Sequence, residues 1–471
     1  MGVPTPEPFR LGKDAATMQL WARRDDRWRV TLLTLACFLL ASTGWLLWLY
    51  HLTSITEARN VNVLTMGIGY PMQALGIAAF AFLQRSQRRT GARQTTSAAI
   101  VGYVICLVPA ALAPNLAPTL AFGYLANLLC GYMAGYYLFC LARYVEQGYR
   151  GIVFGGAYAA STGLGWLLSA VGNGVATHGI LGLASCVALS LVALCAVYDM
   201  RNASFAEQVQ PHETDETSSR QLVTLACIVV TLMSLNKGVG FGFPTTDLLA
   251  GVSLELSRLL YGAGLLIAGA ISDRDRRYGA LCCAAALVMP FLMLALSGAS
   301  APATLMWALA YLLNGFFSVF RVVVITDLAA ERNRYELAGL GLLFGRIGDS
   351  LGTVLSATLD ASPLVLITVT AVMFACTIAL FFVLYQRLYM PVAEPVLSER
   401  EIFERFAARH DLSARERDVL RLLLERHSNA EIASELFVSE ATVKFHVRNV
   451  LRKTGCKNRT ELMALYAEPH E

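Results

Sequence analysis

Positive charge is concentrated in one short segment near the C-terminus. Between Ala441 and Thr460 the chain has six basic residues and no acidic residue. The six are Lys444, Arg448, Arg452, Lys453, Lys457 and Arg459. Ammonium and guanidinium groups bind phosphate oxygens, and both also hydrogen-bond base edges in the major groove of DNA. The segment is therefore a candidate nucleic-acid interface; the alternative is a solvated face of a small helical bundle.

Helix-cap signals divide the same region into short helices. Ser398 with Glu401 is a capping box that begins a short helix inside a linker predicted over residues 386–411. Four further helices are predicted to begin after Ser413, Ser428, Ser439 and Asn458. Only the pair Phe437-Val438 separates the second of these helices from the third. So short a turn predicts a helix-turn-helix, whose second member can enter a major groove.

Four segments of this region resemble the LuxR/GerE-type DNA-binding domain. They read LSARERDVL, SNAEIA, VSEATVKFH and KTGCKNR. The resemblance covers about residues 410–467, and the domain is predicted at 412–471. The residues implied to face base edges are Lys444, Phe445 and Arg448, with Arg452 on the same helix face. The residues implied to contact the DNA backbone are Asn429, Thr442 and Lys453. The resemblance also implies a homodimer through the last helix, and it places His427 where the family usually has glycine.

The rest of the chain has the composition of a membrane protein. Of its 471 residues 56% are hydrophobic and 15% are charged, too few charges to cover a soluble surface. A purely soluble enzyme is excluded. Twelve apolar runs have the length of membrane-spanning helices. They lie at about 30–50, 62–83, 98–114, 118–142, 152–171, 179–198, 222–243, 250–271, 280–297, 303–325, 336–359 and 363–385. The predicted fold class is all-α, a twelve-helix membrane domain over residues 30–385.

Basic residues between these runs predict the orientation. The loops on the side of the N-terminal segment, residues 1–29, hold nineteen lysines and arginines, whereas those on the other side hold only Arg59. Positive charge marks the cytoplasmic side. We therefore expect an inner-membrane protein with both termini in the cytoplasm.

A six-plus-six division around a long internal loop at 199–221 resembles the major facilitator superfamily. One loop motif supports the resemblance, since Gly269, Asp273, Arg274 and Arg277 are similar to the family's Gly-x-x-x-Asp-Arg-x-x-Arg loop. The resemblance implies that these residues latch neighbouring helix ends and bias the conformational state. The alternative is that the charges only set the orientation of the helices.

Two pairs of opposite charges lie within predicted spans. Glu255 with Arg258, and Arg346 with Asp349, are each three residues apart on one helix, where each pair can neutralise itself. Such pairs are more often structural than functional.

Two further cations within the spans have no such partner. Lys237 has its nearest acid at Asp247, and Arg321 at Asp327. Charges inside a bilayer are costly and usually face a cavity or a partner. Lys237 and Arg321 are therefore the candidate contacts for an anionic or amphipathic small molecule, with snorkelling to the membrane surface as the alternative for Lys237.

No catalytic motif occurs, so we expect no enzyme, no cofactor and no metal. The eleven cysteines have no CxxC pair or regular spacing. Three functions remain: a membrane-bound regulator that senses a small molecule and binds double-stranded DNA, a transporter with a regulatory DNA-binding tail, and a bundle whose helix-turn-helix contacts only protein. The ligand, the operator sequence and the sign of regulation cannot be read from the sequence.

Overall fold

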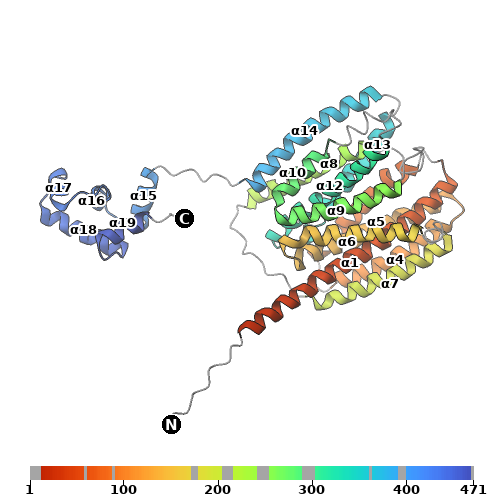
Figure 1. Cartoon of the computed structure of the whole chain (residues 1–471), viewed down its shortest axis with the longest axis horizontal. Helices are drawn as coiled ribbons and strands as arrows, with labels where there is room; N and C mark the ends of the chain where they lie inside the picture. The colour runs from red at the N-terminus through yellow and green to blue at the C-terminus, as the bar shows by residue number, and fades with distance from the viewer. Residues whose placement is uncertain are drawn as a thin grey trace, which may run out of the picture. The chain divides into compact units, whose positions relative to one another are not determined.

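A computed structural model describes residues 12–57, 61–86, 91–170, 179–203, 216–240, 254–288, 303–359, 363–390 and 399–467. Within these ranges all regular structure is helical and no strand occurs, as the all-α prediction requires. The chain divides into two compact units, Met1–Met390 and Pro391–Glu471. We call them the membrane unit and the tail, and describe each by itself (Figure 1).

In the first half of the membrane unit, the described residues form six long helices and a short π-helix. They are α1 (Gly12–Ile55), η1 (Val63–Ile68) continuing into α3 (Gly69–Ser86), α4 (Ala92–Leu112), α5 (Leu116–Tyr144), α6 (Arg150–Ala170) and α7 (Gly179–Asp199). The second half contains α8 (Glu216–Gly240), α9 (Leu254–Arg274), α10 (Arg276–Ala286), α12 (Ala303–Glu331), α13 (Leu340–Leu359) and α14 (Pro363–Tyr389).

Nine helical segments within the described ranges are long and apolar enough to cross a membrane. They are Asp26–Ile55, Val63–Arg85, Ala92–Leu112, Leu116–Tyr144, Gln147–Leu168, Gly179–Asn202, Arg220–Val239, Ala308–Glu331 and Ile367–Tyr389. The predicted runs at 250–271, 280–297 and 336–359 overlap α9, α10 and α13, respectively. The described residues thus show many apolar helices without establishing the count of twelve.

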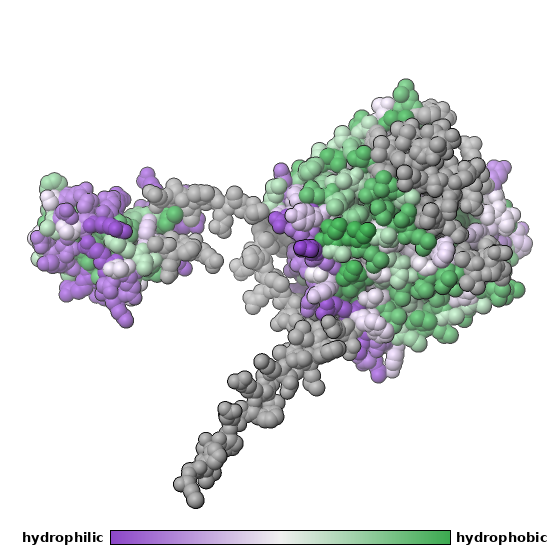
Figure 2. Space-filling model, viewed as in Figure 1, coloured by the Kyte–Doolittle hydropathy of each residue, from purple (hydrophilic) through white to green (hydrophobic). Residues whose placement is uncertain are grey.

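The surface of the membrane unit matches a lipid environment. Large apolar side chains such as Phe82, Ile105 and Leu364 are well exposed. Figure 2 shows hydrophobic residues over much of the visible face of this unit, while hydrophilic residues gather at the end where α14 finishes. Water would not solvate so wide an apolar surface, whereas lipid chains do. The unit is therefore that of a multi-pass membrane protein.

Glycines allow the helices of the two halves to pack closely. A Cβ atom on Gly264 of α9 would collide with the carbonyl oxygen of Leu312 on α12. A Cβ atom on Gly269, one turn further, would collide with the carbonyl oxygen of Gly151 on α6. Small residues at such crossings let helix backbones approach in membranes, where packing rather than hydrophobicity drives association. Helix α9 thereby lies against both α12 of its own half and α6 of the other half.

The described residues of the tail, 399–467, form five helices around one core. They are α15 (Glu399–Arg409), α16 (Ala414–Leu424), α17 (Asn429–Glu435), α18 (Glu440–Thr454) and α19 (Arg459–Ala467). Leu420, Ile432, Val443, Val450 and Leu462 are almost completely buried in this core. Helix α15, which the sequence placed in the linker, contributes buried Phe403 and Phe406 to the same core. Linker residues 391–398 lie outside the described residues.

Local signals set the ends of the tail helices. Ser413 with Glu416, and Ser428 with Glu431, form capping boxes, and Ser439 accepts a hydrogen bond from the backbone of α18. Helix α18 stops at Gly455, whose φ of +75° is a left-handed conformation that suits glycine. Short-range chemistry therefore determines where the helix that carries the basic segment begins and ends.

Candidate functional site

The exposed face of α18 carries the side chains that were expected to face base edges. Lys444, Phe445 and Arg448 are exposed, whereas Val443 and Val450 on the opposite face are buried. The Arg448 guanidinium lies 5.9 Å from the centre of the Phe445 ring. The Lys444 ammonium lies 3.8 Å from the Glu440 carboxylate, a solvent-exposed pair of small energetic weight. Both cations are available to a ligand.

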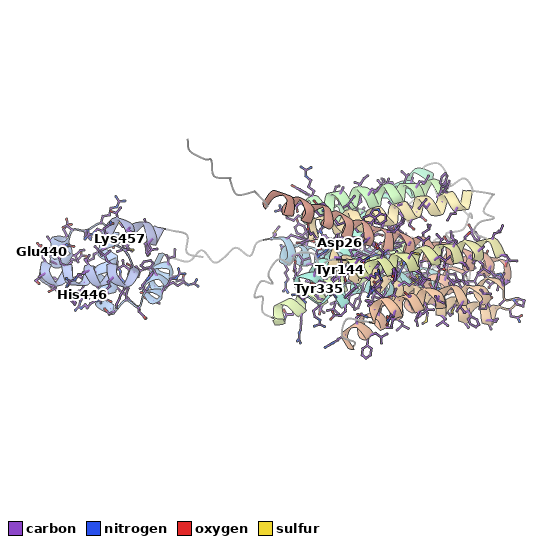
Figure 3. The ribbon with its side chains drawn as sticks, turned by 90° about the horizontal axis from the view of Figure 1, so that it is seen from below. Asp26, Tyr144, Tyr335, Glu440, His446 and Lys457 are labelled. Atoms are coloured by element: carbon purple, nitrogen blue, oxygen red, sulfur yellow. The ribbon has the colours of Figure 1, made fainter. Side chains whose placement is uncertain are left out.

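A shallow hollow on the tail brings further predicted DNA contacts together. Its lining residues are Asn429, Lys444, Val447, Arg448, Leu451, Arg452, Cys456 and Lys457. Figure 3 shows the side chains of the tail, with Glu440, His446 and Lys457 labelled. Four cations at a concave, exposed surface form a strongly electropositive patch. This hollow and the exposed face of α18 together are called the basic face below.

Two of the six basic residues form an ion pair or hydrogen bonds with other residues of the tail. The Lys453 ammonium lies 2.7 Å from a Glu416 carboxylate oxygen and also bonds the Asp411 carbonyl oxygen at 2.7 Å. The Arg459 guanidinium donates to the His427 carbonyl oxygen at 2.6 Å and to the Asn429 side chain. Lys453 and Arg459 therefore hold helices together, a role that their charge alone did not reveal.

The pKa of the Glu416 carboxyl group reflects these contacts within the tail. Its burial favours the neutral form, but hydrogen bonds from Lys453 and from the backbone N–H of Ser413 outweigh burial and lower its pKa. The carboxylate thus stays charged and keeps Lys453 in place. Thr442, also expected to contact the DNA backbone, shares a 2.9 Å hydrogen bond with the Ser439 hydroxyl at the start of α18.

One residue just before α17 has a left-handed backbone conformation. His427 was expected to occupy a position usually filled by glycine, but the left-handed residue is its neighbour Arg426, with φ of +68°. A side chain in this region clashes with the following carbonyl group, at a cost of about 1–2 kcal/mol. The left-handed conformation at this turn thus falls on Arg426, one residue before His427.

Replacing Arg426 with glycine is therefore expected to stabilise the tail. Relief of the strain is partly offset by the larger conformational entropy of glycine in the unfolded chain, so we expect a gain of about 0.5–1 kcal/mol. Urea unfolding of the tail, residues 391–471, measures the change. His427→Gly is the matched control and should not stabilise. An equal gain from both variants would contradict the assignment of strain to Arg426.

A cavity of about 300 Å³ lies between the two halves of the membrane unit. Its lining comes from α1, η1, α3 and α6 of the first half and from α8, α9, α12 and α13 of the second. Lys237 and Arg321, the two cations singled out by the sequence, both line it. The sequence did not single out Arg346 or Asp349 as ligand contacts, and they line it as well.

One carboxylate is shared by three cations at this cavity. Asp349 lies 2.7 Å from the Lys237 ammonium, 3.3 Å from the Arg321 guanidinium and 3.9 Å from the Arg346 guanidinium. The expected neutral pair of Arg346 and Asp349 is thus only the longest of three contacts. The expected neighbour of Lys237, Asp247, lies outside the described residues, as do the side chains of Glu255 and Arg258.

Asp327 forms ion pairs with two other arginines and is not the partner of Arg321. Its carboxylate lies 2.8 Å from the Arg150 guanidinium and 2.7 Å from that of Arg276. Arg276 also binds Asp273 at 2.7 Å. We call Arg150, Asp273, Arg276 and Asp327 the ionic cluster. It joins α6 of the first half to α9, α10 and α12 of the second half.

The ionic cluster includes part of the predicted latch. Asp273 accepts hydrogen bonds from the first backbone N–H groups of α6, those of Gly151 at 2.8 Å and Ile152 at 2.6 Å. A carboxylate is favourable at a helix N-terminus because it complements the helix dipole and unpaired donors. Arg274 is exposed, and Arg277 pairs with Asp275 at 2.7 Å with 58% of its side chain exposed. Of the four predicted latch residues, Gly269 and Asp273 lie at this contact. The cation at the contact is Arg276, and not Arg274 or Arg277 as the motif implied.

Aromatic side chains accompany the cluster at the same end of the bundle. Figure 3 shows the labelled residues Asp26, Tyr144 and Tyr335 towards one end of the membrane unit. Arg29 of α1 binds Asp26 at 2.8 Å and Asp199 of α7 at 3.0 Å. Ion pairs thus tie helix ends within the first half as well as between the halves.

Comparisons with known proteins give different matches for the two units. Residues 410–466 match the model of bacterial regulatory proteins, luxR family. The spore germination protein GerE of Bacillus subtilis (strain 168) is 45% identical over 56 residues, which are 12% of this chain and 76% of that protein. The nitrate/nitrite response regulator protein NarP of Escherichia coli (strain K12) is 43% identical over 76 residues, 15% of this chain and 34% of that protein. The chain thus spans about a third of NarP, and the similarity concerns the DNA-binding region.

The membrane unit resembles a transporter in fold. The crystal structure of the human organic anion transporter MFSD10 (TETRAN) matches with a TM-score of 0.54 at 16% identity, covering 75% of this chain and 99% of that chain. Such low identity shows a common fold and nothing of substrate. The membrane region therefore has a major-facilitator-like fold, as the loop motif suggested. No group of three metal-binding side chains occurs among the described residues.

Proposed function

The chain belongs to the luxR family of bacterial regulatory proteins, and on that premise we propose that it is a membrane-bound transcription regulator. The basic face of the tail carries the proposal. It combines exposed Lys444 and Arg448 on a helix of helix-turn-helix geometry with an otherwise self-contained core. In this proposal Lys444, Phe445 and Arg448 read base edges, while Arg452 and Lys457 bind phosphates.

The two units are joined by a short tether. Helix α14 ends at Tyr389 and α15 begins at Glu399, so ten peptide steps span at most about 36 Å. The orientation proposed from the basic loops places the tail in the cytoplasm. DNA would then be bound close to the inner face of the membrane, by a homodimer paired through α19.

We further propose that the membrane unit controls this binding by sensing a small molecule. The cavity between its halves can hold a ligand, and the ionic cluster joins the same two halves through Asp273 and Asp327. A ligand that changes how the two halves pack against each other would shift the positions of the ends of α10 and α14. Asp273 and Gly269 would act as the latch, with Arg276 as its cation.

Selection of DNA from a random double-stranded library tests the regulator directly. Full-length protein in lipid nanodiscs, and separately the tail, should enrich a motif with two related half-sites about 34 Å apart between centres. The matched control carries both Lys444→Ala and Arg448→Ala and should retain only weak, non-specific binding. If neither preparation enriches a motif, the proposal fails, and a helix-turn-helix that contacts only protein becomes the better explanation.

A transporter with a regulatory tail is the second candidate. The major-facilitator-like fold favours it, because the cavity lies between two halves as a transport site does. Net uptake of a cavity ligand into vesicles would support transport. Binding without uptake would support sensing alone.

A further inference from the structure

We propose that the cavity of the membrane unit binds an aromatic carboxylic acid in its ionised form. This inference rests on the proposed sensing function, since it names the class of ligand that the same cavity would take. Three properties of the lining carry it: an excess of positive charge, buried donors without a partner, and walls of aromatic rings.

The charge at the cavity is unbalanced. Among the described residues that line the cavity, Lys237, Arg321 and Arg346 contribute three positive charges and Asp349 contributes one negative charge, an excess of two positive charges. These side chains are 17%, 6% and 19% exposed, respectively, against 3% for Asp349. Uncompensated charge is costly at such low exposure, and a bound anion would offset the cost. A cationic ligand is correspondingly disfavoured.

Buried polar atoms at the cavity still lack hydrogen-bond partners. Within the described part of the chain the Nε atoms of Arg321 and Arg346 have none, and Arg321 is only 5% exposed. Buried donors are nearly always satisfied in native proteins, so an unsatisfied pair at a cavity indicates a missing acceptor. The planar guanidinium group matches a carboxylate in particular, because two parallel N–H groups can meet its two oxygens.

Six aromatic side chains also line the cavity, among small, polar and aliphatic residues. Tyr158 and Tyr261 meet edge to face with ring centres 5.3 Å apart, and Tyr311 continues the row 6.4 Å from Tyr261. Tyr70 lies under the Arg346 guanidinium at 4.1 Å. The buried indole N–H of Trp45, which also lines the cavity, has no partner among the described residues. Aromatic rings pack favourably in offset and edge-to-face contacts, so these walls suit a ring attached to the acid.

The size of the cavity limits the ligand. Its volume of about 300 Å³ is at the lower end of the range for small-molecule sites. One or two fused rings with a short acidic side chain fit within it. The carboxylate would lie among Lys237, Arg321 and Arg346, sharing these cations with Asp349, and the ring would lie among the tyrosines.

Binding of matched acid and amide probes tests the ligand class. The full-length protein in nanodiscs is titrated at pH 7.5 with benzoate, phenylacetate, salicylate and indole-3-acetate, each beside its own amide, by thermal shift and calorimetry. At least one acid should bind ten or more times more tightly than its amide. Amides that equal or exceed their acids, or no binding by any of the four acids at millimolar concentration, would overturn the proposal.

Variants of opposite charge separate electrostatic recognition from general disruption. Arg321→Gln should weaken binding of the acid at least tenfold, with Arg321→Lys intermediate, whereas Asp349→Asn should tighten it because the competing internal carboxylate is gone. Arg201→Gln, two residues beyond the end of α7 and outside the cavity, is the matched control and should leave the affinity unchanged. A similar loss of affinity in the Arg321 and Asp349 variants would contradict the proposal, and unligated thermal unfolding shows whether each variant is folded.

The same preparations distinguish failure of this inference from failure of the proposed function. Retention of the selected DNA motif is measured on each sample. Motif binding without acid binding overturns the ligand class and leaves the regulator in place. Acid binding without motif binding supports the ligand class and overturns the regulator.

Discussion

Replacing Asp327 with asparagine is expected to destabilise the packed arrangement of the two halves by about 3–5 kcal/mol, the usual cost of removing one partner from a buried ion pair. The Asp327 side chain is 9% exposed and that of Arg150 is 7% exposed. Arg150 keeps backbone hydrogen bonds to Val145 and Ala142 but loses its only ion pair among the described residues. Arg276 keeps Asp273. The halves should therefore separate more readily at this end.

Hydrogen exchange of the full-length protein in nanodiscs measures this effect. Backbone amides at the start of α6, at Gly151 and Ile152, should exchange faster in the variant because the contact that covers them opens more often. Glu336→Gln is the matched control, since it removes one partner of the more exposed pair with Arg334 and such pairs contribute about 0–1 kcal/mol. Unchanged exchange in the Asp327 variant would show that the ionic cluster does not hold the halves together.

Replacing Arg448 with alanine is expected to weaken binding of the selected DNA motif by about 1–3 kcal/mol, or roughly 5- to 150-fold. Lys444→Ala should have an effect of similar size. Both side chains are exposed on α18, so their removal should leave the fold intact and remove only contacts to DNA.

Competition binding at several salt concentrations separates base contacts from phosphate contacts. Arg448→Ala should lower affinity for the motif and leave non-specific affinity nearly unchanged. Lys457→Ala should lower both and reduce the salt slope by about one. Arg405→Ala removes an exposed cation of α15 outside the basic face and is the matched control. A uniform loss for Arg448→Ala across all sequences would place that residue on phosphate instead of on a base.

Lys453→Ala should behave differently from these surface variants. Because Lys453 bonds Glu416 and the Asp411 carbonyl oxygen, its removal would leave a buried carboxylate without its cation. Loss of DNA binding by this variant would therefore reflect the stability of the tail as well as any contact to the DNA backbone.

The sequence by itself determined the features that depend on near neighbours along the chain. The capping boxes at Ser413 and Ser428 and the stop at Gly455 were all predictable, because caps and left-handed glycines act within three or four residues. The membrane class followed from composition. The all-α class and the two family resemblances likewise agree with the comparisons.

Only the tertiary structure decided which distant charges meet. Arg150 and Asp327 are 177 residues apart in sequence, and the three cations around Asp349 come from α8, α12 and α13. The sequence paired Arg321 with Asp327 because they are close along the chain, whereas helix packing turns Arg321 towards Asp349. A membrane helix is apolar on most of its surface, so its periodicity does not say which helix lies beside it. The partners of its few charges are therefore set by how the whole bundle packs.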